Sequence, residues 1–145
     1  VCVRGLGVAL LLGGGASIAL ALVPDLDQRI PCLTHRGRTH TVQFALLAGG
    51  ALAIVGALVG LEGGLLATVG WSAFGFLVGA VTISSHLFAD MLTPAGIDLF
   101  GDGHRRSYDV ARAANPIANY ALLGLGVLAV ILATLAGGAI AGPVF

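Results

Sequence analysis

The hydrophobic residues of this 145-residue chain lie in long runs instead of short alternating stretches. Charge-free spans cover residues 5–24, 41–61, 63–85 and 113–145. Each reaches the roughly 20 residues that an α-helix needs to cross a bilayer core of about 30 Å. The pattern predicts an all-α, polytopic membrane protein, with residues 1–145 forming one domain built as a bundle of about four transmembrane helices.

Two other interpretations of the apolar runs are weaker. A closed β-barrel requires short strands of alternating polarity, and runs such as ALLAGGALAIVGALVGL do not alternate. The first run is long, ends at Pro24-Asp25 and lacks a small-residue cleavage pattern, so we expect a retained helix and not a signal peptide. Because the chain begins with valine, further residues before Val1 stay an open question.

Composition and charge support the membrane prediction. The chain is 57% hydrophobic and 10% charged, with a mean hydropathy of +1.00, which no soluble domain of this size needs. The formal net charge is zero, which argues against nucleic-acid binding through a basic patch. Cys2 and Cys32 form no paired-cysteine motif, so neither a disulfide nor a zinc-thiolate site is expected.

The arginines predict how the chain is threaded. Arg29, Arg36 and Arg38 lie between the first two spans, and Arg105, Arg106 and Arg112 lie between the last two. Four spans place both segments on one side of the membrane, and the positive-inside rule makes that side cytoplasmic. We therefore expect an inner-membrane protein with these segments facing the cytoplasm and Glu62 outside.

Three polar clusters lie at that same face. They are PDLD after the first span, HRGRTH before the second, and the His86–Asp90 pair, whose i, i+4 spacing puts both side chains on one face of the third helix. Imidazole and carboxylate groups bind zinc, manganese or iron at hydrolytic sites, as one ion or as two bridged ions. The candidate metal ligands are Asp25, Asp27, His35, His40, His86 and Asp90.

Each cluster also has a purely structural explanation. PDLD is typical of a helix end followed by a turn, and HRGRTH of a positively charged loop in which Thr39 or Thr41 caps the next helix. His86 and Asp90 also fit a buried hydrogen-bonded pair. Their joint presence at one membrane face favours a metal site over these explanations.

The same segments resemble the YdjM-like inner-membrane proteins, a family of membrane-bound metal-dependent hydrolases that includes a LexA-regulated member. The pieces that carry the resemblance are LVPDLD, HRGRTH, SSHLFADMLTPAGIDLF and RSYDVARAANPIANY. The resemblance implies hydrolysis at the membrane and the metal-ligand role for the same six residues. Two departures are a missing histidine near the start and Gln28 after PDLD, where the family often has histidine.

The leading hypothesis is a hydrolase that uses a divalent metal, with Asp25 or Asp27 as general base. Arg36, Arg38, Arg105 and Arg106 suit an anionic phosphate or lipid substrate, and they equally fit topology signals. The alternatives are a divalent-cation transporter, a lipid phosphatase with a histidine nucleophile, whose lysine and Ser-Gly-His motifs are absent here, and a metal-binding structural membrane protein. The sequence leaves the oligomeric state open.

Overall fold

A computed structural model of the protein describes residues 2–31 and 34–141. Four α-helices account for most of these residues: α1 Cys2–Ala21, α2 Val42–Gly60, α3 Gly64–Met91 and α4 Pro116–Ala141. The connections contain the 3-10 helices η1 Pro24–Arg29, η2 Arg38–His40 and η3 Leu61–Gly63. The all-α prediction is confirmed.

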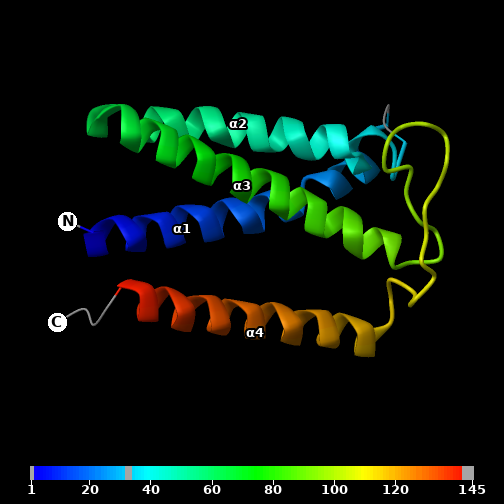
Figure 1. The fold of residues 1–145 in the computed structure, drawn as a ribbon. Coiled ribbons are helices and arrows are strands. Elements are labelled where there is room, and N and C mark those ends of the chain that lie inside the picture. Colours follow the sequence, from blue (N-terminus) through cyan, green and yellow to red (C-terminus); the bar gives the residue numbers. More distant parts are fainter. Residues whose placement is uncertain (1, 32–33, 142–145) are drawn as a thin grey trace.

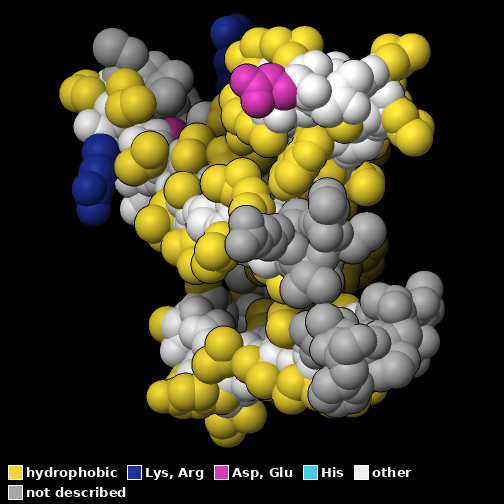
Figure 2. Space-filling view, turned by 90° about the vertical axis from the view of Figure 1, so that its left-hand side faces the viewer, with side chains coloured by type: hydrophobic (Ala, Val, Ile, Leu, Met, Phe, Trp, Pro, Cys, Tyr) yellow, Lys and Arg dark blue, Asp and Glu magenta, His cyan; other side chains and the backbone are white. Residues whose placement is uncertain are grey.

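Three helical stretches of the described chain are long and apolar enough to cross a membrane: residues 7–29, 42–91 and 116–133. The middle stretch of 50 residues turns back at η3, so α2 and α3 form an antiparallel hairpin (Figure 1). Figure 2 shows a mainly hydrophobic surface at this end of the molecule. Leu65 and Leu66, in the first turn of α3, are 82% and 86% exposed, as expected for side chains that contact lipid.

Glycines allow the two helices of the hairpin to approach closely. A Cβ atom on Gly56 would collide with the Trp71 carbonyl, and one on Gly75 with the Leu52 carbonyl. Membrane helices gain packing contacts in this way because lipid offers little hydrophobic driving force for association. The hairpin is therefore the rigid element that holds His86 and Asp90.

The other two helices pack less closely. α1 joins the hairpin through a hydrogen bond of 3.2 Å from Thr82 Oγ1 to Ser17 Oγ. α4 runs beside the other helices, and none of its residues from Pro116 to Ala133 is buried (Figure 1). Its exposed leucines and isoleucines indicate a lipid-facing helix.

The connections η1, η2 and residues 92–115 lie together at the end of the bundle away from the α2–α3 turn (Figure 1). In residues 92–115, Ile97 and Arg106 pair as an antiparallel bridge, and Val42 donates a hydrogen bond of 2.9 Å to the Leu99 carbonyl. Ile97 is fully buried and joins Ile83 in the core. The arginine-rich segments thus share one end of the molecule, as the sequence predicts.

Candidate metal centre

The 3-10 helix η1 directs its two aspartates to different sides. Pro24 is compatible with the first position of a helix because its φ is already fixed and no donor is needed there. Residues in a 3-10 helix are rotated by about 120° from one another, so carboxylates two positions apart diverge. Asp27 is 2% exposed, whereas the Asp25 side chain is 47% exposed.

A tight turn brings the HRGRTH segment back onto η1. Gly37 donates a hydrogen bond of 2.9 Å to the Thr34 carbonyl, and a Cβ atom on Gly37 would lie 2.7 Å from that oxygen. Arg36 adopts a left-handed backbone conformation with φ of 59°, which is rare for residues other than glycine. Its amide is held by a bond of 3.1 Å to Asp27 Oδ2. The turn places His35 and His40 on either side of Asp27.

The third contribution comes from α3, which continues past Ser85 to Met91. His86 and Asp90 lie on one face within about two turns of its end. His86 Nε2 is 3.5 Å from Asp90 Oδ2. The helix and the two turns therefore bring all three polar clusters together at one end of the bundle.

His40, His86 and Asp90 bring three potential ligand atoms within 4.8 Å of one another, and Asp25 Oδ1 lies beside both imidazoles. His40 Nε2 lies 3.3 Å from Asp90 Oδ2 and 3.6 Å from Asp25 Oδ1, and His86 Nε2 lies 3.7 Å from Asp25 Oδ1. A tetrahedral ion with ligands at about 2.0–2.1 Å has ligand–ligand distances of about 3.3–3.4 Å. The observed separations are within a few tenths of an ångström of that arrangement.

Three of these atoms are buried and have no hydrogen-bond partner among the described residues: His40 Nε2, His86 Nε2 and Asp90 Oδ2. Buried polar atoms are almost always satisfied, because an unpaired one costs about 1–3 kcal/mol. Burial lowers the pKa of His40 although Asp90 and Asp27 act to raise it, which favours the neutral imidazole. A neutral imidazole is the form that binds metal, so the donor set fits a divalent cation.

Asp27 lies behind this centre and is occupied by the protein itself. Its Oδ1 accepts from His35 Nδ1 at 2.9 Å, and its Oδ2 accepts from the Thr39 hydroxyl at 2.7 Å and from the Arg36 amide. His40 Nδ1 lies 3.0 Å from Thr39 Oγ1. Protonation at Nδ1 therefore leaves the Nε2 lone pair directed toward Asp90.

Thr39 is a member of this network that the sequence analysis does not identify, because there it is expected only as a possible helix cap. Thr41 supplies that cap instead and accepts a hydrogen bond of 3.3 Å from the Phe44 amide. The signal in the sequence was the position of Thr39 beside His40 within HRGRTH. A hydroxyl next to a ligand histidine is well placed to orient the ring.

Arg36 lies inside the protein, where the sequence had suggested a substrate-binding arginine. Its guanidinium is 13% exposed and donates from Nη2 to Asp90 Oδ1 at 2.7 Å and from Nη1 to Thr93 Oγ1 at 3.1 Å. The Thr93 hydroxyl in turn donates to the Asp90 carbonyl. Arg36 therefore holds the outer oxygen of Asp90 while the inner one faces the two imidazoles.

His35 lies at the open side of the centre. One of its ring nitrogens lies within 4.8 Å of a carboxylate oxygen of Asp25 and of a ring nitrogen of His40. The ring is 44% exposed and is oriented by Asp27. All six predicted ligands are thus near one another: His40, His86 and Asp90 form one group, Asp25 and His35 form a second group with His40, and Asp27 lies behind them.

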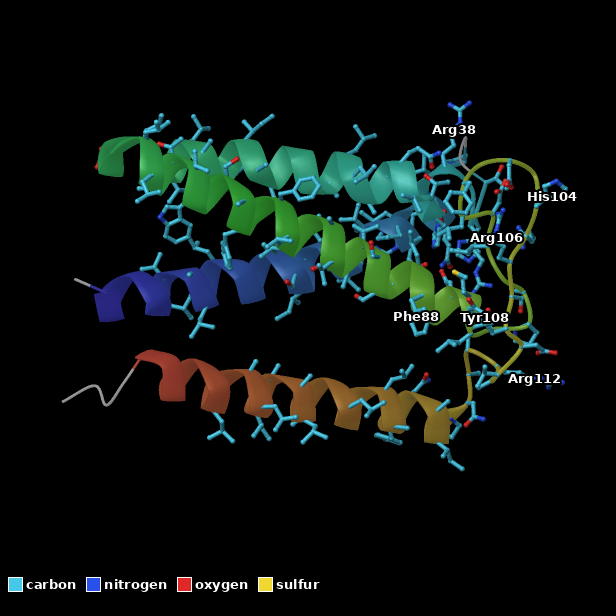
Figure 3. The ribbon with its side chains drawn as sticks, viewed as in Figure 1. Arg38, Phe88, His104, Arg106, Tyr108 and Arg112 are labelled. Atoms are coloured by element: carbon cyan, nitrogen blue, oxygen red, sulfur yellow. The ribbon has the colours of Figure 1, made fainter. Side chains whose placement is uncertain are left out.

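The other predicted substrate arginines lie farther out. Arg38 is exposed and extends away from the bundle (Figure 3). Arg105 donates to the Ala95 carbonyl at 3.1 Å. Arg106 is paired with Asp102 at 2.8 Å. Of these three, Arg38 has the guanidinium without a hydrogen-bond partner in the described chain.

Comparison with known proteins identifies a family over nearly the whole sequence. Residues 4–142 match the profile of a family described as YdjM inner membrane protein. Neither a curated protein nor a solved structure matches the chain. The matched range includes η1, η2 and the end of α3, which together build the centre.

Proposed function

The chain belongs to the YdjM inner membrane protein family, and for a membrane protein with this centre we propose metal-dependent hydrolysis at the membrane surface. The observation that carries the proposal is the set of buried, unpartnered atoms His40 Nε2, His86 Nε2 and Asp90 Oδ2. They form two imidazole donors and one carboxylate donor, the three-ligand set of catalytic zinc sites, which suits zinc first and manganese second.

A bound divalent ion supplies Lewis-acid activation of water at neutral pH and polarises the bond under attack. The protein's own residues do the rest. Asp25 is the acidic side chain of the centre that water reaches, so we assign it the role of proton acceptor in addition to facing the imidazoles. Asp27 has both oxygens hydrogen-bonded and serves to orient His35 and His40.

The depth of the centre favours hydrolysis over transport. Transport sites normally lie near the bilayer midplane between helices. Here His86 and Asp90 occupy the last turns of a helix of 28 residues, and the other donors come from the adjoining turns. The centre therefore belongs to the membrane surface, and the arginine-rich segments beside it favour the cytoplasmic side.

A phosphate-containing substrate suits the charges around the centre. Arg38 and Arg105 lie on the same end of the molecule, exposed to solvent. Guanidinium groups bind phosphate oxygens in two-point contacts, and the metal-binding donors supply the adjacent site for the scissile bond. We propose a phosphate ester or an anionic lipid as substrate.

The test is metal content and hydrolysis measured on the same preparation. Protein purified in detergent should retain about one zinc ion per chain, determined by mass spectrometry of the digested sample. It should release phosphate or a lipid fragment from phospholipid vesicles, lose this activity on chelation and regain it with zinc. A well-folded chain that binds no divalent metal at neutral pH would overturn the proposal.

A further inference from the structure

A cavity of about 340 Å³ lies between the end of α3 and the start of α4, beside the donors described above. Most of its wall is apolar and includes Leu92, directly after α3, with Ala118 and Leu122 from α4. Asp90 and Arg112 also line it. Its volume is within the range of about 300–1,000 Å³ that is typical of small-ligand sites.

The position of the cavity limits what can occupy it. α3 and α4 are both long, apolar helices, and the exposed surface of α4 from Pro116 to Ala133 is lipid-facing. A space between two such helices is therefore reached from the bilayer. An acyl chain is the apolar group that this environment supplies in quantity.

The charge at the rim specifies the other end of the ligand. Arg112 is exposed and extends away from the helices from the segment before α4 (Figure 3). No hydrogen bond or ion pair engages its guanidinium within the described residues, whereas Arg36 and Arg106 are both paired with aspartates. An unpaired guanidinium at the end of the bundle, at headgroup depth, complements a lipid phosphate.

We propose that this cavity binds an anionic phospholipid of the surrounding bilayer, with an acyl chain between α3 and α4 and the phosphate at Arg112. Because Asp90 belongs both to the cavity wall and to the metal centre, a lipid seated here lies beside the donors. That the bound lipid is the substrate rests on the proposed hydrolase function. Binding itself does not depend on it.

The experiment counts lipids retained by the protein in native mass spectrometry after mixing with phosphatidylglycerol or phosphatidylcholine in detergent. Ala118→Trp fills the cavity from the α4 side. Its matched control, Ala129→Trp, lies about three turns farther along the same face of α4 and outside the cavity. Arg112→Gln removes the rim charge without filling the cavity.

The parent should retain phosphatidylglycerol in preference to phosphatidylcholine, and Ala129→Trp should behave like the parent. Ala118→Trp should lose the retained lipid. Arg112→Gln should weaken phosphatidylglycerol retention about five- to ten-fold and phosphatidylcholine retention by less, because the choline cation already offsets the phosphate charge. Equal retention of the two lipids by the parent, or unchanged retention by both Ala118→Trp and Arg112→Gln, would overturn the site.

Two further outcomes separate the alternatives. A parent dimer that Ala118→Trp converts to a monomer would replace the lipid by a second copy of the chain and overturn the proposal. The measurements are repeated on metal-free His86→Ala, which should retain phosphatidylglycerol as the parent does. If it does so while the parent neither binds zinc nor hydrolyses lipid, the hydrolase function fails and the lipid site stands.

Discussion

Two groups of polar side chains lie at the same end of the molecule, and only one of them has the properties of a binding site. The metal centre comprises Asp25, His40, His86 and Asp90. The second group, here called the loop cluster, comprises Asp98, Asp102, His104 and Arg106 in the segment between α3 and α4. Both groups contain aspartate and histidine, but they differ in how the polar atoms of those residues are satisfied.

The acidic groups of the loop cluster find their partners within the loop. Asp98 accepts hydrogen bonds of 3.0 and 2.8 Å from the amides of Asp102 and Gly103. Asp102 accepts from the His104 amide at 2.9 Å and from the Arg106 guanidinium at 2.8 Å. Asp102 and His104 are exposed and Asp98 is half-buried, so water competes for these contacts.

The metal centre shows the opposite arrangement. His40 Nε2, His86 Nε2 and Asp90 Oδ2 are buried and have no hydrogen-bond partner among the described residues, while the outer atoms of His40 and Asp90 are held by Thr39 and Arg36. Ligand-competent residue types occur in both clusters. What distinguishes a candidate site is that the fold directs buried donors at one point and fixes their other ends.

The largest difference between the two clusters should appear when an inward donor is removed. His86→Ala and Asp90→Asn should each reduce bound zinc from about one ion per chain to near zero, since a dication needs both the count and the charge of its ligands. Asp102→Asn is the matched control in the loop cluster and should retain full metal content. The measurement is zinc stoichiometry on monodisperse protein.

Full metal content in both His86→Ala and Asp90→Asn would show that these residues are a packing pair. The comparison between the clusters would then have no functional meaning. Membrane insertion should be unchanged in either variant, because removal of a polar group does not oppose partitioning of an apolar helix.

A smaller effect is expected from residues behind the donors. Asp27→Asn should weaken zinc binding about 10- to 100-fold without abolishing it. The side-chain amide of asparagine holds the Thr39 hydroxyl and the Arg36 backbone amide less well than the carboxylate does, so the orientation of His40 Nε2 toward the centre is less fixed. Zinc titration with a competing chelator measures the change. Asp98→Asn makes an equivalent change in the loop cluster and should leave affinity unaltered; equal weakening in both would argue for a general loss of stability.

The sequence predicts the fold well because charge-free runs of the right length have few alternatives in a bilayer. It also predicts that the three polar clusters meet, since an even number of crossings returns the chain to the same side. It also predicts that α3 continues past the charge-free run that ends at Ser85, because the i, i+4 spacing of His86 and Asp90 assigns both residues to the third helix.

The division of roles within the centre is not readable from the sequence. Asp25 and Asp27 differ because of the rotation between positions in η1, a 3-10 helix that turn-forming residues alone do not specify. Arg36 turns inward because its backbone is left-handed, with φ of 59°, and Asp27 holds its amide. Both outcomes depend on contacts between segments, which residue type cannot reveal.

The contrast is sharpened further by the two arginines that flank Gly37. Arg36→Gln should lower the stability of the metal-free protein by roughly 1.5–3 kcal/mol, because the hydrogen bonds from a charged group to Asp90 and Thr93 are lost in a poorly accessible site. Zinc should restore part of this stability by compensating the Asp90 charge. Arg38→Gln, at an exposed position, should change neither value. Thermal unfolding in detergent, with chelator and with zinc, measures both variants, and equal destabilisation would contradict the role given to Arg36.

The smallest effect belongs to the loop cluster itself. The hydrogen bond from Arg106 holds the pKa of Asp102 well below its ordinary value of 3.8. A carboxyl group whose pKa is lower in the folded than in the unfolded chain stabilises the fold above the unfolded pKa, and this contribution is lost as the pH falls through the folded one. Asp102→Asn should therefore unfold at a slightly lower temperature than the parent at pH 7. The difference should shrink progressively as the pH is lowered below about 4.

Because the Asp102 carboxylate is exposed and screened by salt, added sodium chloride should also reduce the difference in unfolding temperature. A gap between parent and variant that persists unchanged at low pH and high salt would show that Asp102 acts through packing, and the loop cluster would no longer be the solvated counterpart of the metal centre.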